Sequence, residues 1–493
     1  MKEKIVIFGA GDFGKKALGF YGADRISFFV SNSNFGSERF HCGKKVLSFE
    51  EYLKVQKDFT TVIATARHKE IEDQLQANRI NDYAVFFPEF GYTYRLIEEK
   101  LKNADGVIAL VGVSQETEII YRYLLRFVKS EQIQIADKQG RDTVGTKWHH
   151  YDVRDYADIW KEVSFTVMTP GNASVACELY CKRVSGMRCN IVNPISRKQR
   201  VEECELVHDP YKFSYIKDSE DQYVARDKQW LDPEKIVNEV VDELELGKPL
   251  FSHVEIETIN RCNLNCSFCP AGYSRDTRKR AVMDEDMFKS IVDQLAELNY
   301  SGRFGTFSNN EPFLDSRIVS FNKYAREKLP NAHIFLATNG TLLTVDTFTQ
   351  IIPYLDELFI DNYNKNLELN PTSVEIQKYC EDHPELARKV TIELRHTEEI
   401  LSSRGGDAPN RVQKEIWPNV KCALPWFQLI VRPTGELSTC CADPMGKRTM
   451  GDLRKQTLLE AWYGEEYVKF RNALSRGRGA LDRCKYCDAF NLY

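Results

Sequence analysis

Three cysteines near the middle of the chain, Cys262, Cys266 and Cys269, are spaced for metal chemistry. Three thiolates within such a short stretch can ligate one [4Fe–4S] cluster and leave its fourth iron open. An open iron can bind a small molecule, which a fully ligated cluster cannot do. A structural zinc ion usually takes four ligands in paired CxxC spacings, so zinc fits this set less well. The first cysteine set therefore predicts an iron–sulfur cluster with a ligand-binding iron.

A second cysteine set lies toward the C-terminal end and has four members, Cys422, Cys440, Cys484 and Cys487. Four thiolates can saturate an iron–sulfur cluster. Four cysteines that end in CxxC also suit a tetrahedral zinc site, so both metals stay open for this set. Cys441 competes with Cys440 for one place, and the distance from Gly435 favours Cys440.

Alternating strands and helices must position the first set. From His253 onward, short apolar runs that read as strands alternate with helical stretches over about 160 residues, which is typical of a (β/α) barrel. The expected strands are 254–257, 304–307, 334–337, 358–360 and 390–394. The cysteine loop follows the first of them directly, at the end of the barrel where active sites lie. The basic run at 275–280 that follows the loop is interpreted as solvated.

Cys262-x3-Cys266-x2-Cys269, with Phe268 before the last cysteine, resembles the signature of the radical S-adenosylmethionine (SAM) superfamily. In that family the amino and carboxylate groups of SAM chelate the open iron. Reduction of the cluster then cleaves SAM to methionine and a 5′-deoxyadenosyl radical, which takes a hydrogen atom from the substrate. The resemblance implies SAM and a [4Fe–4S] cluster as cofactors, and a flavodoxin- or ferredoxin-type electron donor.

Two later strand ends extend this resemblance. The stretch 308–312 occupies the place of the family's Gly-Gly-Glu-Pro motif, which holds the SAM ammonium, with asparagines replacing both glycines. The stretch 337–340 resembles the common Thr-Asn-Gly, near the SAM ribose or carboxylate. The expected SAM contacts are therefore Phe268, Asn309, Asn310, Glu311, Pro312, Thr338 and Asn339.

The second cysteine set resembles the auxiliary-cluster module called Twitch, a half-length relative of the SPASM domain. In related dehydrogenases a saturated cluster accepts the electron that the substrate radical releases when it loses a proton and becomes a ketone or aldehyde. Arg395 and Arg404 are candidates for the group that acts on that proton; the alternative is that each binds the SAM carboxylate or is structural. In related epimerases a cysteine instead returns a hydrogen atom, and Cys441 and Cys380 are the candidates for that role.

The front of the chain shows the βαβ rhythm of a Rossmann-like domain twice. We predict an α/β protein with Rossmann-like units at 1–100 and 101–205, and a polar connector at 206–249. A partial (β/α)6 TIM barrel follows at 250–415, and a small auxiliary iron–sulfur domain at 416–493.

Glycines in the two front units predict a nucleotide site. Gly9-x-Gly11-x-x-Gly14 matches the dinucleotide fingerprint. The acidic residue expected about 20 residues later is missing. In the second unit Gly112 marks the loop, and Asp137 ends the second strand. These residues predict a nucleotide or nucleotide-sugar ligand; the alternative is that both units are scaffolds or docking modules.

Composition limits the function. A net charge of −5 without a basic patch argues against nucleic acid as a partner. No apolar stretch is long enough to span a membrane, and no signal peptide is visible, which predicts a cytoplasmic protein. We expect a radical SAM dehydrogenase or epimerase that acts on a hydroxyl-bearing carbon of a sugar, aminocyclitol or nucleotide-linked metabolite. The alternatives are a radical SAM enzyme that modifies a ribosomal peptide, and a non-catalytic iron–sulfur sensor or scaffold.

Overall fold

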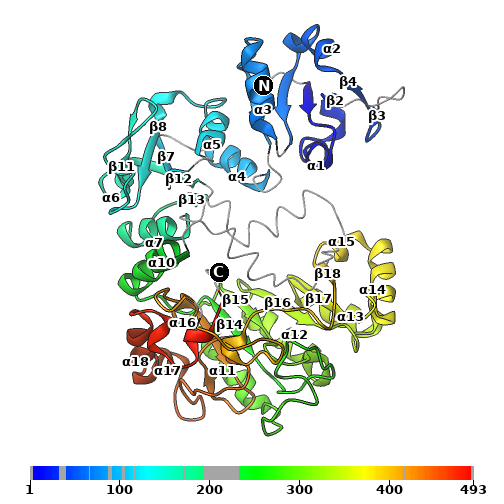
Figure 1. Ribbon diagram of the computed structural model, residues 1–493, viewed down its shortest axis with the longest axis vertical. Coiled ribbons are helices and arrows are strands. Elements are labelled where there is room, and N and C mark those ends of the chain that lie inside the picture. The colour runs from blue at the N-terminus through cyan, green and yellow to red at the C-terminus, as the bar shows by residue number, and fades with distance from the viewer. Residues whose placement is uncertain are drawn as a thin grey trace. The chain divides into compact units, whose positions relative to one another are not determined.

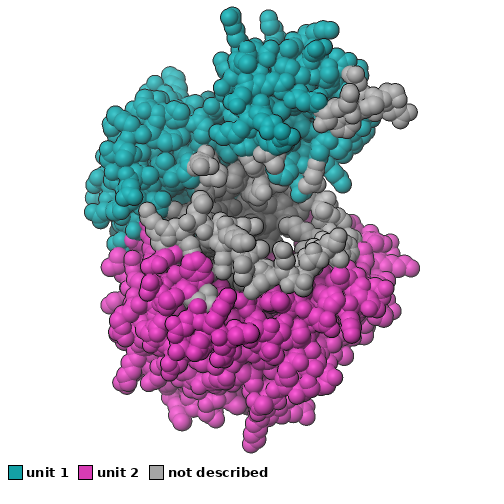
Figure 2. Space-filling model, in the orientation of Figure 1, with its two compact units in different colours: residues 1–209 teal, residues 210–493 magenta. Residues whose placement is uncertain are grey.

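The computed structural model divides the chain into two compact units, residues 1–209 and 210–493 (Figure 2). The structure describes residues 4–32, 40–65, 67–86, 91–102, 106–114, 117–169, 174–192, 233–415 and 417–489. Most of the predicted connector, 206–232, lies outside the described residues. None of the described helices is long and apolar enough to cross a membrane.

Unit 1 contains two α/β sheets in the places where two α/β units are predicted (Figure 1). In the first sheet the order is β3-β4-β2-β1-β5-β6, and only the β3–β4 pair is antiparallel. All four residues of β1 are buried, as expected for a central parallel strand. The strands are β1 (Ile5–Phe8), β2 (Ile26–Val30), β3 (Phe40–His41), β4 (Lys44–Leu47), β5 (Thr60–Ile63) and β6 (Tyr83–Val85). The helices are α1 (Asp12–Tyr21), α2 (Phe49–Leu53), α3 (His68–Ala77) and α4 (Gly91–Leu101).

The second sheet of unit 1 is parallel throughout, in the order β11-β8-β7-β12-β13. Buried side chains of both sheets join in one hydrophobic cluster, so the two halves share a core. The strands are β7 (Val107–Val111), β8 (Ile133–Asp137), β11 (Arg154–Asp155), β12 (Val163–Met168) and β13 (Ile191–Val192), beside a short hairpin of β9 (Lys147–Trp148) and β10 (Tyr151–Asp152). The helices are α5 (Thr117–Leu124), α6 (Tyr156–Ile159) and α7 (Ser174–Val184).

Unit 2 is built on a seven-stranded sheet in the order β18-β17-β16-β15-β14-β19-β20. Six of these strands are parallel, and only β20 is antiparallel, which gives the predicted partial barrel. The strands are β14 (His253–Ile256), β15 (Arg303–Gly305), β16 (His333–Thr338), β17 (Glu357–Tyr363), β18 (Val390–Arg395), β19 (Gln428–Val431) and β20 (Leu437–Ser438). The intervening helices are α11 (Glu285–Glu297), α12 (Ile318–Lys328), α13 (Val345–Ile351), α14 (Pro371–Asp382) and α15 (Pro384–Ala387).

The predicted boundary at 415/416 cuts through this sheet. The sixth parallel strand, β19, comes from the tail and pairs with β14. One tail helix precedes β19 and two follow it: α16 (Leu424–Phe427), α17 (Leu458–Trp462) and α18 (Glu465–Leu474). The connector helix α10 (Pro233–Gly247) contacts the tail, because the Asn238 side chain accepts a hydrogen bond from the Lys421 N–H. The C-terminal region is therefore continuous with the barrel.

Alternation along β17 explains which side chains reach the barrel interior. Successive side chains of a strand point to opposite faces. Leu358, Ile360 and Asn362 are buried, whereas the residues between them are less buried. The less buried set includes Asp361 and Tyr363, and both line the pocket described next.

Candidate active site

A pocket of about 290 Å³ lies at the carboxyl ends of the barrel strands. All three cysteines of the first set line it, because their loop follows β14 directly. Six of the seven predicted SAM contacts also line it; Pro312 instead is buried at the start of the short helix η6 (Pro312–Leu314). The structure thus brings together motifs that are far apart in sequence.

The cysteine loop is held by an arginine of the basic run. The Arg275 guanidinium donates to the backbone carbonyls of Cys266, of Cys269 at 3.4 Å and of Asn265 at 3.1 Å. Arg278 is also turned inward, and only about a tenth of its side chain is exposed. The interpretation of this run as a solvated loop is therefore wrong for Arg275 and Arg278, because their guanidinium groups donate hydrogen bonds to the cysteine loop and to neighbouring residues.

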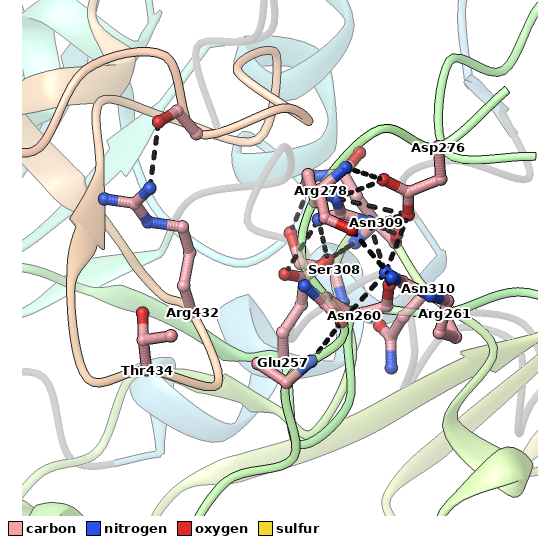
Figure 3. A network of polar contacts seen from close by, with 12 residues as sticks. Glu257, Asn260, Arg261, Asp276, Arg278, Ser308, Asn309, Asn310, Arg432 and Thr434 are labelled. Carbon is pink, nitrogen blue, oxygen red and sulfur yellow. Dashed lines mark hydrogen bonds and ion pairs between the residues drawn. The ribbon is translucent and has the colours of Figure 1, made fainter.

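Arg278 forms the centre of a polar network that joins two strand ends (Figure 3). Its guanidinium lies 3.3 Å from a Glu257 oxygen and 2.9 Å from an Asp276 oxygen, and donates to the Asn309 carbonyl at 3.3 Å. The Asn309 N–H donates to Glu257 at 3.0 Å. Burial raises the pKa of Glu257, and the Arg278 guanidinium opposes that shift. The network fixes the turn after β15 against the end of β14.

The two asparagines that replace the family's glycines have distinct contacts. The Asn309 side chain accepts from Arg404 Nη1 at 3.2 Å and donates to the Cys441 carbonyl at 3.3 Å. The Asn310 Oδ1 accepts from the Ser308 N–H at 2.9 Å, which orients the amide. Its Nδ2 is buried and has no hydrogen-bond partner within the described residues. An unpaired donor in the lining of this pocket fits a carboxylate ligand such as that of SAM.

Glu311 connects the turns after β15 and β16. Its buried carboxylate accepts from the Thr338 hydroxyl at 2.8 Å, the Asn339 N–H at 2.9 Å and the Phe313 N–H at 3.1 Å. Burial raises its pKa to about 7. Contact between Glu311 and the SAM ammonium stays a prediction, because these oxygens already accept three hydrogen bonds. Asn339 in turn donates to Cys262 Sγ at 3.8 Å, which links the β16 turn to the cysteine loop.

The structure separates the two predicted arginines. Arg404 lines the pocket, in the short helix η8 (Arg404–Gly406), where its φ of +49° is unusual for a residue with a side chain. Arg395 ends β18 and lies 2.8 Å from Glu399, 3.5 Å from Glu393 and 3.8 Å from Asp361. The catalytic role predicted for Arg395 is not supported, because its guanidinium is held among carboxylates and is not part of the pocket lining.

The two neighbouring cysteines of the tail face different sites. Cys441 lines the barrel pocket. Cys440 lines a second cavity of about 250 Å³ together with Cys484 and Cys487. Burial raises the pKa of the Cys440 thiol, and the neighbouring thiolates of Cys441, Cys422, Cys487 and Cys484 raise it further. The structure therefore places Cys440, and not Cys441, with the second set.

The second cysteine set can supply the ligands of an iron–sulfur cluster. Three of its thiols line this cavity, and the fourth, Cys422, is close enough to Cys440 to raise its pKa. Four thiols match the ligand set of a [4Fe–4S] cluster. The first set, with three thiols and a shared pocket, fits a cluster with one open iron.

The glycine fingerprint of unit 1 is explained by packing. A Cβ on Gly9 would lie 2.2 Å from the Ala64 carbonyl oxygen, and one on Gly14 would lie 1.9 Å from the Gly9 oxygen. Gly11, directly before α1, has no neighbour within 4 Å of a built Cβ. The loop therefore has the shape of the fingerprint, and a ligand there stays a prediction.

Asp137 does not have the free carboxylate that ribose binding needs. It is fully buried and accepts from the Val113 N–H, the Thr143 hydroxyl and the Cys177 thiol. Arg141 also lies 3.2 Å from it. The predicted nucleotide role of Asp137 is not supported, because its carboxylate oxygens accept hydrogen bonds from the loops of the second sheet. Gly112, with φ of +87°, is required there by backbone conformation.

Comparison with known proteins decides the family. The radical SAM superfamily matches residues 256–384, and the SPASM iron–sulfur cluster-binding domain matches residues 422–488. The chain contains a radical SAM domain. It uses SAM with a SAM-binding [4Fe–4S] cluster, and its SPASM region carries an auxiliary cluster. The prediction of a radical SAM domain followed by a SPASM-like auxiliary-cluster domain is confirmed.

Several relatives are known. An S-adenosyl-L-methionine-dependent 2-deoxy-scyllo-inosamine dehydrogenase of Niallia circulans is 28% identical over 240 residues, which are 48% of this chain and 93% of the relative. The crystal structure of BtrN in complex with AdoMet and 2-DOIA has 26% identity, covers 49% of this chain and 94% of BtrN, and gives a TM-score of 0.43. Streptococcus suis SuiB bound to precursor peptide SuiA has 12% identity, covers 64% of this chain and 88% of SuiB, and gives a TM-score of 0.31.

Sequence reasoning missed three polar residues of the pocket, Glu255, Ser308 and Asp361. Each is an ordinary polar residue when read alone. The signal that identifies the two acids is their place in strands β14 and β17, where a carboxylate at an inward position of a barrel is unusual. Ser308 directly precedes the asparagines of the SAM motif.

Proposed function

We propose that this enzyme oxidises a hydroxyl-bearing carbon of an aminocyclitol to a ketone. The observation that carries the proposal is the charge pattern of the pocket that holds the first cysteine set. It combines one guanidinium, Arg404, with three carboxylates, Glu255, Glu311 and Asp361. A polyol with an amino group needs these two kinds of partner. The similarity to the 2-deoxy-scyllo-inosamine dehydrogenase supports the same substrate class.

SAM and the cluster at the first cysteine set, when bound, supply a radical that removes one hydrogen atom, and the cluster at the second set takes up one electron. Residues around the pocket bind and orient the substrate. The Asn309 amide holds the Arg404 guanidinium at 3.2 Å. A guanidinium keeps its proton in proteins, so Arg404 cannot be the proton acceptor that we predicted. Its fixed positive charge instead stabilises the substrate oxygen as that oxygen loses its proton.

Asp361 is suited to bind an amino group. Its side chain is 31% exposed and lines the pocket, and it lies 3.8 Å from the Arg395 guanidinium. Arg395 also pairs with Glu393 and Glu399, so one positive charge faces three carboxylates. This excess of negative charge favours a cationic ligand such as an ammonium group.

Replacing Asp361 with asparagine is expected to raise KM for an amino-bearing substrate by about tenfold or more, because a charge-assisted hydrogen bond is lost. Burial raises the pKa of Asp361 to about 6; Arg395 and Arg404 oppose this shift, and Glu393 and Glu399 add to it. The carboxylate is ionised above that pH. KM of the wild type should therefore rise as the pH falls below about 6. Initial rates against pH measure both effects.

KM for SAM in the Asp361→Asn variant serves as the control and should not change. An analogue of the substrate with a hydroxyl in place of the amine should bind equally to both proteins. If the variant loses affinity for SAM, or equally for both substrates, Asp361 does not bind the amino group of the substrate.

Epimerisation is the second candidate reaction, and the position of Cys441 favours it. Its thiol lines the same pocket as the first cysteine set, where it could return a hydrogen atom to a substrate radical. If the enzyme is the proposed dehydrogenase, Cys441→Ala should leave ketone formation largely unchanged. An epimerase would instead form a product with the mass of the substrate in H₂O and with one added deuterium in D₂O. That product would disappear in the Cys441→Ala variant.

The proposed function is tested with anaerobically reconstituted enzyme, a one-electron reductant, SAM and 2-deoxy-scyllo-inosamine. The expected products are 5′-deoxyadenosine and a ketone that is lighter by two hydrogen atoms, in equal amounts. We further propose a flavodoxin- or ferredoxin-type protein as the electron donor. Oxidation of nucleotide-sugars or modification of a peptide, with no reaction of any aminocyclitol, would contradict the proposed substrate class.

A further inference from the structure

Oxidation of a secondary alcohol to a ketone releases one hydrogen atom, one electron and one proton. The hydrogen atom goes to the 5′-deoxyadenosyl radical and the electron to the auxiliary cluster, as proposed above. The proton needs an acceptor among the side chains of this chain. Arg404 cannot serve, because its guanidinium keeps its own proton. A different group at the pocket wall must therefore take it.

A line of hydrogen bonds leads away from the pocket. Ser308 Oγ donates to Glu255 Oε2 at 2.6 Å, and both residues line the pocket. The other oxygen of Glu255, Oε1, lies 2.8 Å from Nε2 of His253. Glu255 is 7% exposed, so its carboxylate has little access to bulk water. The two contacts use both of its oxygens and connect the pocket to the start of β14.

The fold fixes this geometry. His253 and Glu255 are two residues apart in β14, so their side chains lie on the same face of the strand. The imidazole ring of His253 packs edge-on against Phe335 of β16, with ring centroids 5.4 Å apart. Each member of the line is therefore held by a regular element or by the turn after β15.

Ser308 also lies close to the charge that stabilises the substrate oxygen. The Asn309 Nδ2 donates to Ser308 Oγ at 3.3 Å, while its Oδ1 accepts from Arg404 at 3.2 Å. One amide thus places the serine hydroxyl beside the guanidinium. A substrate hydroxyl that contacts both groups would lose its proton to Ser308 while Arg404 compensates the charge on its oxygen.

We infer that Ser308 and Glu255, with His253 orienting Glu255, form a proton relay that removes the hydroxyl proton during the oxidation, an inference that rests on the proposed function. The substrate O–H bond breaks and its proton binds Ser308 Oγ. Ser308 at the same time gives its own proton to Glu255 Oε2. Glu255 becomes a carboxylic acid and keeps this proton, while the imidazole of His253, 2.8 Å from the other oxygen Oε1, orients the carboxyl group. No relay residue is oxidised or reduced. Ser308 contacts the substrate, and Glu255 and His253 act through it.

Glu255→Gln is the decisive variant, because the amide keeps the shape of the side chain but cannot accept the proton. Formation of 5′-deoxyadenosine, iron content and SAM binding should stay at the wild-type level. Ketone formed per 5′-deoxyadenosine should fall by about a hundredfold, the usual contribution of proton transfer to a positioned group. A substrate-centred radical should accumulate and be visible by electron paramagnetic resonance, because a carbinol radical that keeps its proton is a poor electron donor.

Two further variants protect the test. Ser308→Ala should give the same low ratio of ketone to 5′-deoxyadenosine, and His253→Gln a smaller fall. The matched control is His333→Gln, since His333 pairs with Glu357 at 3.1 Å on neighbouring strands but lines no part of the pocket. Its ratio should equal that of the wild type.

A wild-type ratio in both Glu255→Gln and Ser308→Ala, or an equal fall in His333→Gln, would overturn the relay. If the wild type cleaves SAM but forms no ketone from any aminocyclitol, the proposed oxidation fails, and the relay fails with it. A wild type that forms the ketone while the variants keep the ratio overturns the relay alone.

Discussion

Replacing Cys262, Cys266 and Cys269 together by alanine is expected to abolish SAM cleavage and to remove half of the iron. The three thiols share one pocket with the predicted SAM contacts, whereas the second set lines a separate cavity. The wild type should hold about eight irons per chain and the variant about four, as two [4Fe–4S] clusters require. Iron counting after anaerobic reconstitution and a 5′-deoxyadenosine assay measure both quantities.

Cys42→Ala is the control for this experiment, because Cys42 is an exposed cysteine of unit 1 that belongs to neither set. It should keep full iron content and full SAM cleavage. Loss of all iron from the triple variant, starting from about four in the wild type, would mean that the second cavity holds no [4Fe–4S] cluster. The electron acceptor of the proposed oxidation would then be missing.

Arg404→Ala is expected to lower ketone formation by about 10²–10³-fold, the cost of removing one fixed charge from a developing oxyanion. Formation of 5′-deoxyadenosine should persist, because Asn309 holds the Arg404 guanidinium at 3.2 Å, whereas Arg275 holds the cysteine loop. Arg404→Lys keeps the charge but loses the planar guanidinium, so its rate of ketone formation should lie between those of the wild type and Arg404→Ala. The measurement is the ratio of ketone to 5′-deoxyadenosine, determined by mass spectrometry. An equal loss of SAM cleavage in Arg404→Ala would instead assign Arg404 to SAM binding.

Much of the barrel could be predicted from sequence, because its strands are short apolar runs that alternate with helical patterns. The expected strand 254–257 corresponds to β14, and the later runs correspond to β15–β18. The sixth parallel strand was assigned to the tail. β19 lies close to Cys422 and precedes the turn at Gly435, so local signals tied it to the cysteine set. Only pairing with β14, far away in sequence, reveals its place in the barrel.

The site was predictable where a motif carries it and not where packing decides. Cys262, Glu311 and Asn339 stand in a characteristic order and meet in the structure. Arg395 ends β18 and Arg404 follows it, and nothing local shows which one enters the pocket. The difference comes from Glu393 and Glu399, which hold Arg395, and from the Asn309 amide, which holds Arg404.

The acids of the pocket illustrate the same limit. Asp137 ends a strand of unit 1 and fits a nucleotide-binding pattern, yet its carboxylate accepts hydrogen bonds from neighbouring loops of its own unit. Asp361 fits no motif, yet its inward position in β17 gives it a place in the pocket wall. Strand register, and not residue type, distinguishes the two.

The most direct test of the proposed oxidation uses 2-deoxy-scyllo-inosamine that carries deuterium on its hydroxyl-bearing carbons. The reduced, reconstituted enzyme should transfer one deuterium into each 5′-deoxyadenosine and release an equal amount of ketone. Deuterium-free 5′-deoxyadenosine, or deuterium transfer with a product that is not a ketone, would contradict the account. The first result would remove the aminocyclitol as substrate, and the second would replace oxidation with another radical reaction.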